Sequence, residues 1–209
     1  MKTDLLSITD AFQSRKSILK ETERFCQYYA LTEKNAMHMH LLAEETFNII
    51  YGIFEGFTGT FWLESTPSEN GLLCRIFIDA DVFVNNEQED ALRQFSTTGE
   101  NSAARGIGGM IREIFRCYIQ NAGPEFPMQW QTSEMMFNDG LLYNDIGAYY
   151  GWSLNTYRQN VVNEDSAKSS ERCDELERSI IAKLADEVKI YIKTDCATVV
   201  IEKNLPGVS

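Results

Sequence analysis

The sequence predicts a two-layer α/β (α+β) sandwich, with helices on one face of a mostly antiparallel mixed sheet. Helical periodicity dominates the first third of the chain, and alternating strand-like runs form one early pair and one C-terminal pair. The order is two helices, two strands, a loop, three helices and two strands, which suits this architecture. The length of 209 residues predicts a single domain over residues 1–209, and 44% hydrophobic content is that of a globular chain.

Two helices are expected first. Apolar residues recur at helical spacing over 8–30, and Thr32 is placed to cap a second helix over 33–56. The second helix is apolar nearly all round, which is typical of a buried helix. Glu44 and Asn48 interrupt it, and such polar residues inside an apolar helix require an explanation.

Two antiparallel hairpins are expected next. The runs at 59–65 and 72–79 alternate and are joined by a turn containing Pro67 and Gly71. The runs EVKIYIK and ATVVIEK near the C-terminus form the second pair.

The middle of the chain is less regular. A polar stretch over 85–105 is interpreted as a loop, and helices are expected at 107–121, 152–162 and 168–186. An aromatic-rich insertion covers about 123–165 and forms either a partner surface or a cover over the core. Its prominent aromatic residues are Trp130, Tyr143, Tyr149, Tyr150 and Trp152.

Charge and composition exclude several classes of protein. The net charge of −12 disfavours binding to nucleic acid or to an anionic membrane, since phosphate contacts need clustered Lys and Arg. No apolar run reaches about 18 residues, and no secretory signal is visible at the N-terminus. Five scattered cysteines without a CxxC pair favour reduced thiols and disfavour zinc. We therefore expect a cytoplasmic protein.

Three elements could carry chemistry. Glu44 and Asn48 lie four residues apart, so both project from one helix face, and carboxylate and amide oxygens suit Mg²⁺. The glycines at 106, 108 and 109 open a helix, whose free N–H groups favour an anion. Asp79 ends a strand and could accept a hydrogen bond from the amine of a purine.

In this order, the elements resemble the Bergerat-fold (GHKL) ATPases, which include gyrase and the histidine kinases. AEETFNII is similar to their N-box, IDADVF stands at their adenine box, and ENSAARGIGGMIREI resembles their lid and second glycine box. The resemblance covers about 10–120 and the last hairpin, and it is greatest to the anti-sigma-factor serine kinases. It implies a histidine-kinase-like ATPase domain that binds ATP and Mg²⁺, with a sigma factor or small antagonist as protein partner and a homodimer as assembly.

The resemblance also implies site roles. Glu44 would be the general base that orients water or an acceptor hydroxyl, Asn48 would ligate Mg²⁺, and Asp79 would contact the adenine amine. The phosphates would be held by Gly106 and Gly108, and the lid contacts would be Asn101, Ser102 and Arg105.

Two departures leave an alternative open. Asp81 and Phe83 stand where the adenine box of the family has glycines. A degenerate ATPase-fold protein that binds another protein without catalytic turnover therefore competes with an active serine kinase. Asp79 and Asp81 also form a DxD pair like that of sugar-nucleotide transferases, although no preceding βαβ series supports that class. His38 and His40 lie two apart on a helix and therefore point to different faces, which disfavours a metal site.

Overall fold

A computed structural model describes residues 1–9, 11–53, 57–69, 71–81, 150–163, 179–192 and 196–206. The predicted loop at 85–105 and the predicted helix at 107–121 lie outside these residues.

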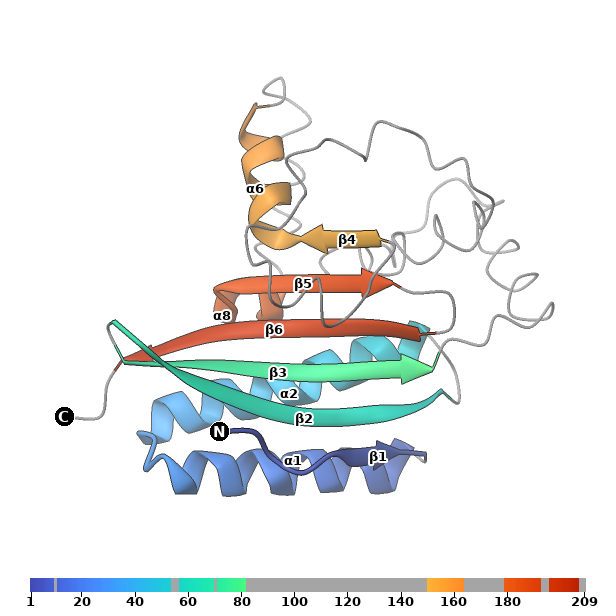
Figure 1. The fold of residues 1–209 in the computed structure, drawn as a ribbon, viewed down its shortest axis with the longest axis vertical. Coiled ribbons are helices and arrows are strands. Elements are labelled where there is room, and N and C mark those ends of the chain that lie inside the picture. Colours follow the sequence, from blue (N-terminus) through green and yellow to red (C-terminus); the bar gives the residue numbers. More distant parts are fainter. Residues whose placement is uncertain are drawn as a thin grey trace.

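A six-stranded sheet forms the centre of the described structure (Figure 1). Its strand order is β1-β2-β3-β6-β5-β4, and each of the five pairings between described strands is antiparallel. The strands are β1 (Leu6–Ile8), β2 (Thr58–Ser68), β3 (Gly71–Asp81), β4 (Tyr150–Ser153), β5 (Glu187–Ile192) and β6 (Cys196–Pro206).

The two predicted hairpins are confirmed and lie side by side. Strands β2 and β3 form the first, β5 and β6 form the second, and β3 pairs with β6 along its length from Gly71↔Pro206 to Asp81↔Cys196. The N-terminal and C-terminal parts of the chain therefore share one sheet.

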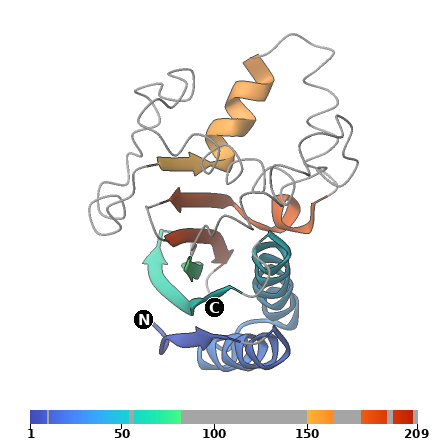
Figure 2. The same cartoon turned by 90° about the vertical axis from the view of Figure 1, so that its right-hand side faces the viewer.

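Helices cover one face of this sheet, as predicted (Figure 2). Helices α1 (Ala11–Tyr28) and α2 (Glu33–Ile53) pack against each other on that face, with the short α8 (Ile180–Leu184) beside α2. Helix α6 (Leu154–Asn163) follows the edge strand β4. The Thr32 cap is confirmed, because its hydroxyl oxygen accepts a hydrogen bond from the Asn35 backbone N–H at 3.3 Å.

The main core lies between the helices and the sheet. Leu42 and Phe47 of α2 are buried in one cluster with Ile76, Ile78 and Ala80 of β3. Side chains alternate along a strand, so the residues between these three point to the opposite side, here called the far face. A second, smaller cluster lies there, formed by Phe77, Tyr191 and Val200 with Trp62 packed against it.

The structure differs from the sequence expectations in three places. Ile8, predicted as the first residue of the helix at 8–30, instead ends the edge strand β1, which the sequence did not predict, and the predicted helix at 152–162 begins only at Leu154, after strand β4. Helix α2 is not buried all round, because Met37 and Asn48 are exposed. Of the predicted helix at 168–186, the described part is α8. No helix among the described residues is long and apolar enough to cross a membrane.

Candidate functional site

Helix α2 places Glu44 and Asn48 on successive turns, as predicted. Asn48 is exposed, and 28% of the Glu44 side chain is exposed. The Glu44 carboxylate is already engaged, because its Oε1 accepts a hydrogen bond from Arg15 Nη2 of α1 in an ion pair. An arginine cannot be deprotonated in a protein, so Glu44 carries a permanent positive neighbour.

Asp79 lies on the far face of the sheet. Its neighbours Ile78 and Ala80 are buried in the core beneath the helices, whereas Asp79 accepts a hydrogen bond from Thr198 Oγ1 of β6 at 2.8 Å. Asp81, two residues further, is exposed and accepts one from Thr58 Oγ1 at 2.8 Å. The structure therefore does not bring Asp79 together with Glu44 and Asn48, which lie on a helix that packs on the other face.

The remaining predicted site residues lie outside the described part of the chain. They are the lid residues and the glycines of the second box, and their roles stay predictions: Asn101, Ser102, Arg105, Gly106 and Gly108.

The described residues do not gather the predicted nucleotide contacts around one space. Glu44 and Asn48 lie on α2, on the helix side of the sheet, whereas Asp79 lies on the far face. The predicted phosphate-binding glycines lie outside the described residues, so the binding of ATP and Mg²⁺ stays a prediction. Among the described residues, no group of three or more His, Cys, Asp or Glu could hold a metal ion.

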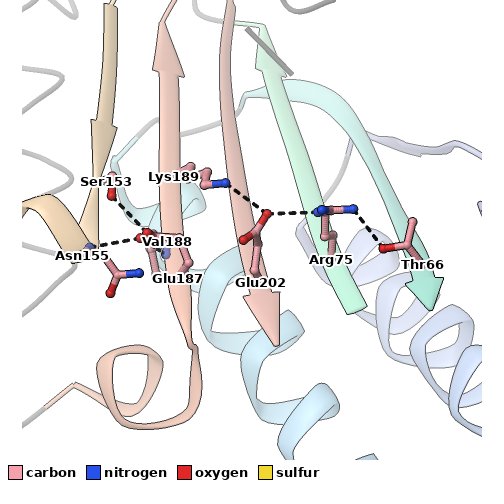
Figure 3. Close-up of polar contacts among 8 residues, drawn as sticks. All are labelled: Thr66, Arg75, Ser153, Asn155, Glu187, Val188, Lys189 and Glu202. Atoms are coloured by element: carbon pink, nitrogen blue, oxygen red, sulfur yellow. Dashed lines mark hydrogen bonds and ion pairs between the residues drawn. The ribbon is translucent and has the colours of Figure 1, made fainter. Parts of the chain in front are cut away.

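A polar network crosses the far face and was not predicted (Figure 3). Glu202 of β6 accepts hydrogen bonds from Arg75 Nε of β3 at 3.0 Å and from Lys189 Nζ of β5 at 3.2 Å. Arg75 also donates to Thr66 Oγ1 of β2 at 3.4 Å. Lys189 is only 7% exposed, so this ion network is largely shielded from solvent.

Glu187 of β5 lies beside this network and joins the start of helix α6 to the sheet (Figure 3). This buried carboxylate accepts hydrogen bonds from Ser153 Oγ at 3.1 Å, from the Asn155 N–H at 3.2 Å and from the Val188 N–H at 2.8 Å. A carboxylate at a helix start also interacts favourably with the helix dipole. Because these oxygens are already hydrogen-bonded to the protein, we assign the network a structural role.

The alternating sequence EVKIYIK could have indicated part of this network. It places Glu187 and Lys189 on one side of the strand, and an apolar strand with two charges on one side requires partners for them. The sequence did not show that Arg75 and Glu202 would be those partners.

The remaining histidine, cysteine and tryptophan residues that the sequence analysis considered, where the structure describes them, have contacts or burial that support the fold. His40 Nε2 lies 2.7 Å from Glu23 Oε2, which joins α2 to α1. Cys26 and Cys74 are buried, and burial raises the pKa of Cys26 to about 11 and that of Cys74 to about 12. Trp152 is 2% exposed and belongs to the main core. Of the two alternatives for the aromatic residues, the burial of Trp152 supports a cover over the core and contradicts a partner surface at this residue.

Comparison with known proteins adds no relative: no protein-family model, no curated protein and no solved structure matches this chain. The resemblance to the Bergerat-fold ATPases therefore depends on the order of the sequence motifs.

Proposed function

We propose that this chain is a regulatory protein that acts by binding another protein, on a scaffold resembling the Bergerat ATPases but without turnover of ATP. The observation that carries the proposal is the separation of Asp79 from Glu44 and Asn48 by the thickness of the sheet. The ion pair between Arg15 and Glu44 adds support, because it engages the carboxylate that a kinase would need as a base.

Exposed apolar side chains support the protein-binding part of the proposal. Aromatic residues and methionine are enriched at protein interfaces, and several large apolar residues of the described structure stand in solvent. These residues are Met1, Leu5, Phe12, Tyr28, Met37 and Ile180. A sigma factor or a small antagonist protein in the cytoplasm is the partner class that the family resemblance suggests.

A thermal-shift titration tests the absence of nucleotide binding. A ligand at 100 times its dissociation constant stabilises the folded state by about 2.7 kcal/mol, which raises the melting temperature measurably. We expect no shift with millimolar Mg-ATP or Mg-ADP. A saturable shift that disappears when EDTA removes Mg²⁺ would overturn this part of the proposal.

Site-specific photo-crosslinking tests the protein-binding part. A benzophenone amino acid at Phe12 or Met37 in the full chain, expressed in the cells that naturally contain it, is expected to give one discrete protein adduct. The same group at the buried position Ile78 serves as the control. Equal labelling patterns at exposed and buried positions, or no adduct at any exposed apolar position, would contradict protein binding.

An ATP-dependent serine kinase that acts on a small antagonist is the second candidate. Solvent reaches both Glu44 and Asn48 on successive turns of α2, so an incoming nucleotide could contact them if Arg15 moved away. This function predicts ATP turnover that is lost in Glu44→Ala. Equal turnover in the parent and in this variant would exclude Glu44 as the base.

A further inference from the structure

The N-terminal residues form one open edge of the sheet. Strand β1 stands at one end of the strand order and pairs, among the described strands, only with β2. The pairing continues before β1. The Met1 amine donates to the Ser65 oxygen at 2.7 Å, the Ser65 N–H donates to the Met1 oxygen at 2.8 Å, and the Thr3 N–H donates to the Leu63 oxygen at 2.9 Å. Residues 1–9 therefore border β2 as one extended stretch, here called the edge segment.

Part of the backbone of the edge segment faces away from the sheet. Met1 and Thr3 direct their backbone groups toward β2, and these directions alternate along a strand. The N–H and C=O groups of Lys2 therefore face outward, and neither has a hydrogen-bond partner among the described residues. Outward backbone groups of this kind can bind one more strand.

A bulge in the edge segment turns an apolar side chain into solvent. Lys2 stands opposite Glu64 and Leu6 stands opposite Phe61, so four steps along the edge segment match three along β2. The extra residue lies beside Leu5, and a bulge leaves such residues outside the regular pairing. Leu5 is 58% exposed. Proteins usually protect an edge with charged side chains, so an exposed leucine there favours an interface.

Helix α1 runs beside the edge segment in the opposite direction (Figure 1). At one end, the Thr9 N–H donates to Ser14 Oγ at 3.2 Å. At the other end, Met1 and Tyr29 meet at Ser65, whose backbone oxygen accepts from the Met1 amine and whose hydroxyl is hydrogen-bonded to the Tyr29 hydroxyl. The helix therefore follows the edge segment along its whole length.

Tyr28 adds an exposed apolar surface to the side of α1 that lies toward the edge segment. It follows Ser14 by fourteen residues, which is about 3.9 helical turns, so the two lie within about 40° of each other around the helix. The Tyr28 ring is 4.9 Å from that of Tyr29 between centroids, and it is 68% exposed. Met1, which shares Ser65 with Tyr29, is exposed as well.

The charges along this edge favour a basic occupant. Lys2 Nζ lies 3.3 Å from Glu64 Oε1, and Arg24 Nη1 lies 3.4 Å from Glu21 Oε2, so these four charges are paired. Asp4 is exposed and forms no ion pair with another described residue. Its free carboxylate has the same sign as the net charge of the chain, −12. Both attract a segment that carries Lys or Arg.

The exposed lysines of α1 do not oppose this preference. Lys16 and Lys20 lie about 160° and about 120° around the helix from Ser14, which marks the side toward the edge segment. They therefore face away from an occupant of the edge.

The position of α1 disfavours a second copy of this chain as the occupant. Both views show α1 alongside β1 and level with it at the margin of the sheet (Figures 1 and 2). Pairing of two edges about a two-fold axis puts both α1 helices on the same face of the joined sheet. Neighbouring strands lie about 4.8 Å apart, whereas packed helices need about 8–10 Å between their axes. Two α1 helices at this margin would overlap, whereas a single extended segment carries no such helix.

We propose that the edge segment docks an extended basic segment of a partner protein, which joins the sheet as a strand outside β1; the proposal deepens the protein-binding function above and rests on it. Backbone bonds to the outward groups of the edge hold the added strand. Lys2 lies over the Trp62 ring on the far face, so Asp4 points to that side and Met1 to the helix side. Alternate side chains of the partner then pair with Asp4 on one face and cover Met1 and Tyr28 on the other.

A peptide titration followed by fluorescence anisotropy tests the proposal on the full chain. The probe is a labelled nonapeptide of alternating valine and lysine, and its control carries N-methyl groups on the central residues, which removes N–H donors from both of its edges. We expect the control peptide to bind at least tenfold more weakly. Asp4→Asn should weaken binding of the probe about threefold, the size of an exposed ion pair, and the identical change Asp81→Asn at an exposed carboxylate of β3 should leave it unchanged. In ¹⁵N-resolved hydrogen exchange, the probe should protect the Lys2 amide.

Four results would overturn the proposal. They are no binding of the probe by the parent at millimolar concentration, equal binding of the N-methylated peptide, equal effects of the Asp4 and Asp81 variants, and a parent dimer in sedimentation equilibrium that dissociates when the probe is added. The comparison of the two peptides uses the parent protein and so does not depend on the folding of a variant. A discrete crosslinked adduct together with any of these results would leave the protein-binding function intact and place its surface elsewhere.

Discussion

The guanidinium of Arg15 on α1 forms an ion pair with the carboxylate of Glu44 on α2. This contact explains a charged residue inside an otherwise apolar helix, since it ties the two helices together at the side of the core. It engages the Oε1 oxygen, so a role as base or metal ligand would require Glu44 to use its other oxygen or the arginine to move. The ion pair thus gives Glu44 a structural role that does not depend on the family resemblance.

The coupling between Arg15 and Glu44 is expected to be small. Their side chains are 51% and 28% exposed, and ion pairs at such sites contribute about 0.2–1 kcal/mol after solvent screening. A double-mutant cycle of Arg15→Ala and Glu44→Ala, measured by urea unfolding, should give a coupling in this range that falls in high salt. A coupling of several kcal/mol, insensitive to salt, would show that the pair is buried more deeply than described.

Two glycines should respond oppositely to alanine. A Cβ at Gly59 of β2 would lie 2.1 Å from the backbone oxygen of Asp79, so Gly59→Ala must push β2 and β3 apart and cost about 1–3 kcal/mol. A Cβ at Gly52 of α2 would meet nothing within 4 Å, and Gly52→Ala should stabilise the helix by about 0.5–1 kcal/mol. Urea unfolding of both variants measures the two changes in stability. A Gly52→Ala variant less stable than the parent would contradict the prediction for the helix.

The sequence predicted the sheet better than the site. Alternation over β2, β3, β5 and β6 is long enough to identify both hairpins, whereas β1 has three residues and shows no readable period. The side of the sheet on which Asp79 lies could not be predicted, because β3 is apolar on both faces: Ile76, Ile78 and Ala80 face the helices, and Phe77 faces the other side. The pairing of Arg15 with Glu44 could not be predicted either, because the packing of two helices brings together residues that are 29 apart.

Loss of the Glu187 carboxylate should destabilise the protein. Glu187→Ala leaves the Ser153 hydroxyl and the Asn155 and Val188 N–H groups without this acceptor. The donors of Ser153 and Val188 are buried, and each buried donor left unpaired costs about 1–3 kcal/mol. Glu187→Gln keeps one carbonyl oxygen and should lose less stability. Asp4→Ala, at an exposed carboxylate, is the control for urea unfolding. Equal stability of Glu187→Ala and this control would contradict the structural role.

Acid should weaken the contact between α1 and α2. Hydrogen bonds from His40 and then from Gln27 lower the pKa of Glu23 below its ordinary value of 4.5. A carboxyl group with a lowered folded pKa contributes stability above its unfolded pKa, and this contribution is lost as pH falls through the folded pKa. The melting temperature of Glu23→Gln should therefore fall less steeply below about pH 4.5 than that of the parent. This linkage would be contradicted if the melting temperatures of the parent and of Glu23→Gln fell in parallel as the pH is lowered.

Thiol reactivity should report unfolding of the helix–sheet core. Burial raises the pKa of Cys26 to about 11 and that of Cys74 to about 12, so at pH 8 about one Cys26 in a thousand is a thiolate, and fewer of Cys74. The folded protein should leave both unmodified by iodoacetamide, as measured by peptide mass spectrometry. Cys196 is partly exposed and is the internal comparison, expected to react first. In urea all three should react at similar rates. Rapid modification of Cys74 in the folded protein would mean that β3 opens without global unfolding, which the pairing of β3 with both β2 and β6 opposes.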